Sequence, residues 1–292
     1  MMLLDGGMGR QLERSGAPFR QPEWSALALM EAPETVLAAH RAFIDAGAAV
    51  ITTNSYALVP FHIGEARFVA DGARLAALAG TLARAAAEGR AVQVAGSLPP
   101  LFGSYRPELF DPVRAPGMLR VLIDALLPSV DLFLAETMSS IAEARAAAEA
   151  VRGTGKPLWV SFTLAEAAGP AVLRSGESVT AAVEAAAEWG AAAILFNCSP
   201  PEVMGAAIDA AWAVLGAEGP PIGVYANAFK ADDGDNEANA DVSPLRADIT
   251  PARYAAWASE WQRRGARLIG GCCGIGPEHI CALGAGPIKH HA

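Results

Sequence analysis

The sequence has no excess of basic residues. Its 292 residues include 22 Lys and Arg against 31 Asp and Glu, which gives a formal net charge of −9 at pH 7. A negatively charged surface is repelled by phosphate groups and by anionic lipids. We therefore expect no nucleic-acid partner and no binding to a membrane surface.

Long hydrophobic runs and targeting signals are also missing. No segment approaches the ~20 consecutive apolar residues that a membrane-spanning helix needs. The first residues, MMLLDGGMGRQLERSG, have no basic start, and Asp5 interrupts their apolar stretch, so we do not expect a signal peptide. Cysteine is scarce, with 4 residues in the chain, which is typical of proteins in a reducing compartment. These features predict a cytoplasmic protein.

Hydrophobic residues, in contrast, are plentiful. They make up 52% of the chain and charged residues 18%, so the composition supplies a large core and excludes global disorder. A length of 292 residues suits one large α/β domain.

Eight short apolar runs are each followed by a stretch with helical spacing. The runs are continuous rather than alternating, as expected for parallel strands that are buried on both faces. The predicted strands are Met2–Asp5, Ala48–Thr53, Val92–Gly96, Asp131–Glu136, Leu158–Phe162, Ala192–Asn197, Pro221–Ala226 and Arg267–Gly271. The predicted helices include Pro33–Ala46, Gly64–Glu88, Met118–Leu127, Ser140–Val151, Ser178–Trp189, Glu202–Leu215 and Pro251–Arg264.

Eight βα units in one chain predict an α/β fold, a (β/α)8 TIM barrel in a single domain. A doubly wound sheet would need a phosphate-binding glycine fingerprint after the first strand, and GGMGRQ at residues 6–11 matches it poorly. We assign residues 1–286 to the barrel and 287–292 to a tail. A polar, acidic insertion at 229–249 follows the seventh strand and is too long for an ordinary barrel loop. The insertion could be a lid over the site or a mobile loop on the surface.

Three of the four cysteines follow predicted strands. Cys198 follows the sixth strand, and Cys272 and Cys273 follow the eighth. The ends of these strands are near neighbours in a closed barrel, so three thiolates can converge on one point and hold zinc. Three protein ligands with one open position are typical of a catalytic zinc. The simpler alternative is that the cysteines act as small buried hydrophobic residues, which we also expect of Cys281.

Two carboxylates also lie at predicted strand ends. Asp5 is the last residue of the first predicted strand and Glu136 the last of the fourth, so together they could hold an α-ammonium group. The backbone N–H groups of Gly6 and Gly7 could then meet an α-carboxylate. Helix capping or a salt bridge is the alternative role for the two carboxylates.

Three further side chains are candidates for contact with substrate. Tyr56 and Trp24 could contact a cationic substrate through their rings, although a single Trp near a helix start more often serves packing. Asn197, at the end of the sixth strand, joins the candidate substrate-binding residues.

Six stretches of the chain resemble the homocysteine S-methyltransferase family. They are LLDGGMGRQLERSG (3–16), WSALAL (24–29), PETVLAAHRAFIDAGAAVITTNSYA (33–57), LAETMSSIAEA (134–144), LFNCSP (195–200) and GGCCGIGPEHI (270–280). The resemblance implies a barrel whose Zn2+ is held by Cys198, Cys272 and Cys273, with Asp5 and Glu136 binding the amino acid. It also implies that no protein residue is catalytic beyond the zinc-bound substrate thiolate, which attacks the methyl carbon of an onium donor and gives methionine.

The methyl donor is open at this stage. A Thr-Met pair follows Glu136 and resembles the sulfonium-using members, so we expect S-methylmethionine or another sulfonium compound. A betaine-type donor and a selenocysteine-type acceptor are alternatives. The expected partners are small molecules, and a homo-oligomer is compatible with the sequence.

Two other classes of function compete with methyl transfer. The three cysteines could serve a thiol-based zinc or redox sensor, which would leave Asp5 and Glu136 without a role. A Schiff-base lyase is excluded by position, because Lys156 precedes the fifth strand and Lys230 lies in the loop after the seventh.

Overall fold

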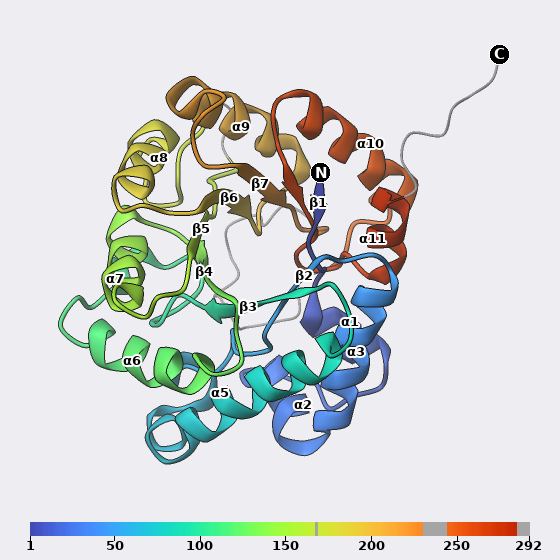
Figure 1. Ribbon diagram of the computed structural model, residues 1–292, viewed down its shortest axis with the longest axis vertical. Helices are drawn as coiled ribbons and strands as arrows, with labels where there is room; N and C mark the ends of the chain where they lie inside the picture. Colours follow the sequence, from blue (N-terminus) through green and yellow to red (C-terminus); the bar gives the residue numbers. More distant parts are fainter. Residues whose placement is uncertain (167–168, 230–243, 285–292) are drawn as a thin grey trace.

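The computed structural model describes residues 1–166, 169–229 and 244–284, and it shows a parallel barrel (Figure 1). The strands pair in the order β1-β8-β7-β6-β5-β4-β3-β2, all parallel. Their bounds are β1 Met2–Leu3, β2 Val50–Thr52, β3 Gln93–Leu98, β4 Leu132–Met138, β5 Leu158–Phe162, β6 Ala193–Asn197, β7 Ile222–Tyr225 and β8 Leu268–Ile269. The Leu4–Val50 bridge brings β1 and β2 together, and the Ala49 N–H donates to the Leu3 carbonyl at 2.8 Å. The predicted (β/α)8 barrel is confirmed.

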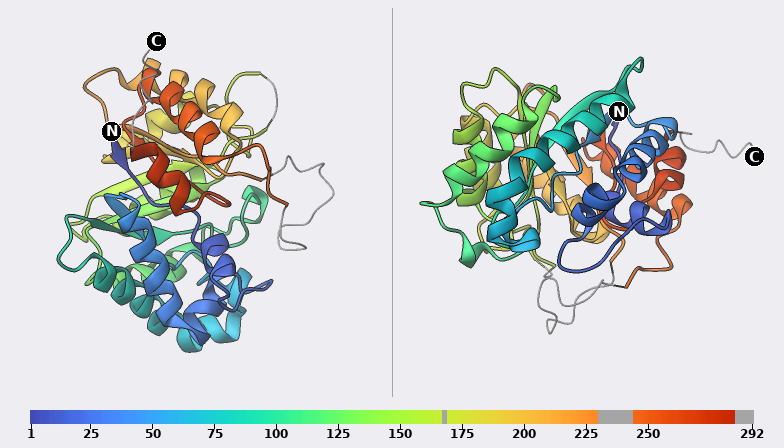
Figure 2. Two further views of the ribbon diagram at one scale, coloured as in Figure 1. Left: turned by 90° about the vertical axis from the view of Figure 1, so that its right-hand side faces the viewer. Right: turned by 90° about the horizontal axis from the view of Figure 1, so that it is seen from below.

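Helices form a ring around the strands (Figure 1). Their bounds are α1 Met8–Arg14, α2 Ser25–Glu31, α3 Pro33–Asp45, α4 Pro60–Ile63, α5 Glu65–Ala87, α6 Ala115–Leu126, α7 Ile141–Val151, α8 Val179–Glu188, α9 Pro201–Leu215, α10 Pro251–Arg263 and α11 Pro277–Gly284, with a 3-10 turn at Pro107–Leu109. Helix α11 packs against α3 and β1, so the two ends of the described chain meet (Figure 2). Among the described helices, none is both long and apolar enough to cross a membrane.

The core consists of two buried layers. The larger one lies between the strands and the helices and contains rings such as Phe43, Phe133 and Trp261. The smaller one fills the barrel interior, and its members are Leu4, Val50, Ala95, Leu132, Leu134, Trp159, Ala193, Leu195, Tyr225 and Leu268. Side chains along a strand alternate between faces. The interior column Leu132 and Leu134 therefore continues to Glu136, and the column Ala193 and Leu195 continues to Asn197.

The predicted strands and long helices are confirmed within a few residues, but some connections contain more structure than expected. Helices α1, α2 and α4 were not predicted, because they have only seven, seven and four residues and show little periodicity. The expectation that Cys281 is a core residue is wrong. Cys281 is exposed on α11, whose buried residues are His279, Ile280 and Leu283.

The insertion at 229–249 is described only at its two ends. Phe229 and Leu245 form an antiparallel bridge, and Arg246 donates to the carboxylate of Glu202 on α9 at 2.8 Å. These contacts fasten the base of the insertion to the barrel. Residues 230–243, on which the choice between lid and surface loop depends, lie outside the described residues, as does the tail at 287–292.

Candidate metal and substrate site

The three predicted cysteine ligands meet above the carboxyl ends of β6 and β8. The sulfur atoms of Cys198, Cys272 and Cys273 all lie within 4.8 Å of one another. Cys198 is 5% exposed, and the other two are partly exposed. In tetrahedral zinc sites with Zn–S bonds of about 2.3 Å, neighbouring sulfurs are roughly 3.8 Å apart. The spacing of this cluster and its all-sulfur chemistry therefore fit a soft metal ion such as zinc.

Hydrogen bonds within the cluster shift the pKa values of the three thiols in opposite directions. Hydrogen bonds from Cys272 and Cys273 lower the pKa of Cys198 well below its usual value. The same interactions raise the pKa of Cys272, and the hydrogen bond with Cys198 raises that of Cys273. A bound cation would reverse the second effect, because it stabilises thiolates.

The backbone is bent at the residues that carry this chemistry. Thr137 and Cys198, which follow Glu136 and Asn197, have φ angles of 61° and 50°. Left-handed φ values are uncommon for residues other than glycine. The bend at Cys198 ends the strand and redirects the chain, so the cysteine side chain faces the barrel mouth instead of continuing the strand alternation.

The Asn197 side chain forms hydrogen bonds with residues of two neighbouring strands. Its side-chain oxygen accepts from the Thr137 N–H at 3.0 Å and from the Ser161 hydroxyl at 2.8 Å, and its nitrogen donates to the Thr137 hydroxyl at 2.8 Å. The amide therefore ties the ends of β4, β5 and β6 together. This arrangement gives Asn197 a role in holding the site, whereas its contact with substrate stays a prediction.

The two predicted carboxylates are buried at the strand ends. Asp5 is 7% exposed and accepts from the Thr52 N–H at 2.7 Å and the Thr52 hydroxyl at 3.2 Å. Glu136 is 9% exposed and accepts from the Ser97 hydroxyl. Burial raises the pKa of Asp5 to about 7 and that of Glu136 to about 8. Two buried carboxyl groups of this kind can stabilise a cationic group such as an ammonium.

The two glycines after β1 lie against the segment that carries the cysteines. A Cβ atom on Gly7 would lie 2.5 Å from the Cys272 carbonyl oxygen, and one on Gly6 would clash with the Ile275 carbonyl oxygen. The Gly7 N–H donates to the Ile275 carbonyl at 2.9 Å. Close backbone approach is thus what requires these glycines, and the Gly7 N–H is occupied in this arrangement.

Tyr56 and Trp24 both border a buried histidine. The ring centroid of His62 lies 6.3 Å from that of Tyr56 and 6.4 Å from that of Trp24. The Tyr56 hydroxyl hydrogen-bonds to the Ser104 hydroxyl at 2.7 Å; burial, and after it charge on Cys198, raises the pKa of Tyr56. Tyr56 therefore lies close to the cysteine cluster. Trp24 also packs edge-on against Phe19, which agrees with the packing role considered for it.

Two residues near the cluster were not predicted. Tyr105 has a φ of 65°, and its side chain is among the groups that lower the pKa of Cys198, after Cys272 and Cys273. The guanidinium carbon of Arg174 lies 4.1 Å from the centre of the Tyr105 ring. Both residues lie in loops after barrel strands, β3 for Tyr105 and β5 for Arg174, where functional residues of barrels concentrate. Loop position was the available signal, but no local pattern marked these two side chains.

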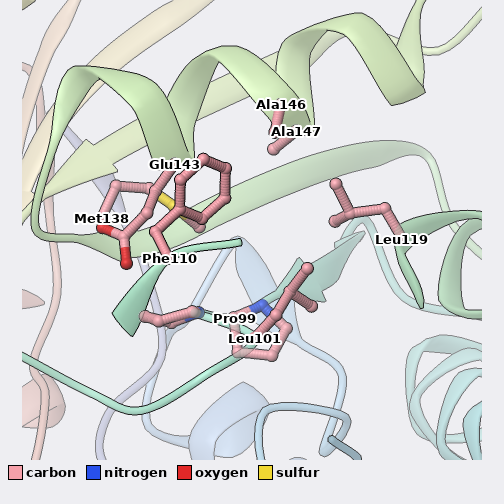
Figure 3. A pocket seen from close by; sticks show the side chains of 9 residues that line it. Pro99, Leu101, Phe110, Leu119, Met138, Glu143, Ala146 and Ala147 are labelled. Atoms are coloured by element: carbon pink, nitrogen blue, oxygen red, sulfur yellow. The ribbon is translucent and has the colours of Figure 1, made fainter. Parts of the chain in front are cut away.

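A small apolar hollow lies to one side of this site (Figure 3). Its lining residues are Pro99, Pro100, Leu101, Phe110, Leu119, Met138, Glu143, Ala146 and Ala147. None of them is among the candidate metal or substrate residues. The hollow belongs to the packing of α6 and α7 against the sheet.

The homocysteine S-methyltransferase family model matches residues 2–285. The chain belongs to the homocysteine S-methyltransferase family. This membership confirms the family and the enzyme class, an S-methyltransferase, that the motifs predicted. Since the match spans nearly the whole chain, the cysteines and carboxylates described above fall within the matched region.

Relatives in plants and bacteria support the family membership. Homocysteine S-methyltransferase of Escherichia coli strain K12 is 31% identical, with 98% of this chain and 94% of that protein covered. Homocysteine S-methyltransferase 1 of Brassica oleracea var. italica is 29% identical, with coverage of 96% and 91%. The similarity therefore covers whole proteins and is not confined to the cysteine motifs.

A solved structure agrees with the fold. The metallated form of the homocysteine methyltransferase MmuM from Escherichia coli superposes with a TM-score of 0.79 at 28% sequence identity, covering 98% of this chain and 96% of that one. The oxidised form of the same protein gives a TM-score of 0.78. Together with the cysteine cluster, the metallated relative indicates a metal site in this family member.

Proposed function

We propose that this S-methyltransferase transfers a methyl group from a sulfonium donor to the thiol of L-homocysteine, with Zn2+ held by Cys198, Cys272 and Cys273. One observation carries the proposal. A cluster of three sulfurs within 4.8 Å lies at the same barrel mouth as the buried carboxylates Asp5 and Glu136. The family membership supplies the reaction class, and the geometry supports the assignment of these five residues.

The metal contributes one kind of chemistry. Zinc held by the three cysteines would act as a Lewis acid that keeps a thiol deprotonated at neutral pH, so that no external base would be needed. The protein holds the two reactants so that sulfur and methyl carbon can react in line, and it excludes water from them. Asn197 and the Thr137 backbone fix the strand ends that carry the metal ligand and the carboxylate.

Asp5 and Glu136 would bind the ammonium group of homocysteine. Their hydrogen bonds to Thr52 and Ser97 hold the carboxyl groups in place. A nearby ammonium ion favours the ionised carboxylates and lowers their raised pKa values. Gly6 and Gly7 would let the chain after β1 pack closely against the Cys272 and Ile275 carbonyls, since side chains there would clash with the protein.

Tyr56 and Trp24 are proposed to contact the positively charged donor. Aromatic faces attract onium groups, and Tyr56 lies close enough to the cluster for charge on Cys198 to affect its pKa. A sulfonium donor such as S-methylmethionine is favoured by the sequence after Glu136. A betaine-type donor and a selenol acceptor stay as alternatives, because both would use the same metal and carboxylates.

No observation favours the sensor hypothesis, which leaves Asp5 and Glu136 unexplained. A reducing, cytoplasmic location is part of the proposal, because the three thiols must stay reduced to bind zinc.

The test is an assay of methionine formation from L-homocysteine and S-methylmethionine, with protein of measured zinc content. We expect turnover that a strong chelator abolishes and that added zinc restores. Turnover with betaine but not with S-methylmethionine would replace the sulfonium donor by an ammonium donor. Turnover that is unaffected by complete removal of zinc would contradict the metal assignment.

A further inference from the structure

Arg174 occupies a fixed place in the connection between β5 and α8. Its neighbour Leu173 is fully buried and forms an antiparallel bridge with Leu164. The next residue, Ser175, donates its N–H to the Ser139 carbonyl at 3.1 Å. The backbone on both sides of Arg174 is therefore attached to the barrel, so the position of its side chain is set by the fold.

The guanidinium group is oriented by three contacts. Its Nε donates to the Thr163 hydroxyl at 3.3 Å, and one terminal nitrogen, Nη2, donates to Glu166 at 3.2 Å. The ring of Tyr105 covers one face of the group, with the guanidinium carbon 4.1 Å from the ring centre. Stacking on an aromatic ring and a hydrogen bond at Nε are features of arginines that recognise planar anions.

One edge of this guanidinium is still available. Among the described residues, no hydrogen bond is found to Nη1, the other terminal nitrogen, whereas arginine has five N–H donors. The side chain is 23% exposed, so a ligand can reach it. A carboxylate is the planar anion that best matches such an edge.

Arg174 also lies close to the cysteine cluster. Thr163, which accepts from Arg174, donates its hydroxyl to the Cys198 carbonyl at 3.3 Å. The guanidinium is thus linked to the metal-ligand segment through Thr163.

We propose that Arg174 binds the carboxylate of the methyl donor, and that this enzyme therefore selects zwitterionic onium donors over simple onium cations. The inference rests on the proposed methyl transfer. A donor with only a positive charge would be repelled by an arginine beside the reaction centre. A donor that also carries a carboxylate turns this repulsion into attraction, which makes Arg174 a specificity-determining residue.

The homocysteine carboxylate is the competing ligand for Arg174. The proposed ammonium site consists of Asp5, after β1, and Glu136, near the end of β4, whereas Arg174 is attached to the end of β5 beside Cys198. We assign the arginine to the donor because the second substrate also needs an anchor and Arg174 is linked through Thr163 to the Cys198 segment. The kinetics of the two substrates separate the two possibilities.

The experiment compares two donors, S-methylmethionine and trimethylsulfonium, with the zinc-loaded wild-type protein and Arg174→Met. We expect Arg174→Met to raise KM for S-methylmethionine by roughly 10- to 100-fold, the loss typical of a charge-assisted hydrogen bond. Turnover of trimethylsulfonium, which has no carboxylate, should not fall and should rise if anything, because the repulsion by the arginine is removed, and KM for homocysteine should stay the same. Arg174→Lys should recover part of the loss, because it keeps the charge but not the planar fork. Calorimetric titration of S-methylmethionine should show the same weakening as a change in dissociation constant.

Arg145→Met is the matched control. Arg145 also stacks on an aromatic ring, that of Trp189, at 5.7 Å, but it lies on the outer helix α7. This variant should leave the kinetics of both donors unchanged. Equal losses for both donors in Arg174→Met would show that the arginine only supports Tyr105, and an increased KM for homocysteine would assign it to the acceptor; either result overturns the inference. If wild-type protein methylates homocysteine with neither donor, the proposed function fails and the inference fails with it.

Discussion

At the scale of single residues, the surroundings of a side chain decide its chemistry. Cys198, Cys272 and Cys273 converge within 4.8 Å, whereas Cys281, eight residues after Cys273, is exposed and belongs to no described metal cluster. The two kinds of cysteine differ in position on the barrel, and only the first kind faces other sulfurs. The ability of a cysteine to bind a metal in this protein therefore depends on whether other cysteine sulfurs lie close to it.

Cys273→Ser tests the metal site. A serine hydroxyl is a much poorer zinc ligand than a thiolate, so the zinc content should fall and activity should decrease on the order of 10³-fold or more, the loss expected when several kcal/mol of metal assistance disappear. The measurements are zinc by atomic emission and methionine formation. Cys281→Ser, which removes an exposed thiol, is the control and should retain both. Full activity in Cys273→Ser would rule out its role as a ligand.

Glu136→Gln tests the ammonium site. Glutamine can keep the hydrogen bond with Ser97 but loses the negative charge, so KM for homocysteine should rise by roughly 10- to 100-fold while zinc stays bound. Glu143→Gln makes the same change at another buried glutamate, one that lines the side hollow and not the site, and KM should not change (Figure 3). Loss of zinc in Glu136→Gln would instead give Glu136 a structural role.

At the scale of elements, the hydrogen bonds that cap the start of helix α7 also hold the residue that follows strand β4. Ser140 and Glu143 form a capping box at the start of α7, and the Glu143 carboxylate also accepts from the Ser139 N–H at 2.7 Å. The β4–α7 turn is therefore fixed directly after the bend at Thr137.

The capping glutamate should make stability depend on pH. Burial raises the pKa of Glu143 from 4.5 to about 7 in the folded protein. The folded state then holds this proton more tightly than the unfolded state, so the contribution to stability is complete below pH 4.5 and is lost as pH rises through 7. The loss is about 3 kcal/mol at most.

Glu143→Gln isolates this contribution. Glutamine can keep the cap without titrating. As pH rises from 5 to 8, the wild type should therefore lose stability relative to the variant. The measurement is the free energy of unfolding of both proteins by urea denaturation at each pH. A difference that is independent of pH would show that Glu143 titrates normally.

At the scale of the whole molecule, the barrel and the metal site are separate sources of stability. The two core layers contain the large buried side chains, and the cysteine cluster lies above them at the barrel mouth. The strands pair through backbone contacts from β1 through β8, and the β1–β2 contact closes the ring.

Chelation should consequently abolish activity without unfolding the protein. Removal of a ligand that binds only the folded state lowers its stability by mass action, which for a domain of this size corresponds to a decrease in melting temperature on the order of 5 °C. Far-UV circular dichroism at 25 °C should remain unchanged, and added zinc should restore the melting temperature. Loss of helical signal on chelation would mean that the metal is needed for folding.

The positions of the strands and long helices could be predicted because their patterns are local. Buried parallel strands such as Leu158–Phe162 read as continuous apolar runs, and the helices between them follow a 3.6-residue period. The strand ends then located Asp5, Glu136 and the three cysteines. The short helices α1, α2 and α4 have too few residues to show a period, which is why they could not be predicted.

The sequence by itself determined the barrel, the family and the residues able to bind a metal, since each depends on the identity and order of residues along the chain. Only the tertiary structure decided which side chains meet. It brings Asn197 within hydrogen-bond distance of Thr137 and Ser161 and pairs the Gly7 N–H with the Ile275 carbonyl. It also places Arg174 beside Tyr105 and Thr163. These contacts join residues from different loops and strands, and their distances depend on how the ring closes, which no local pattern in the chain encodes.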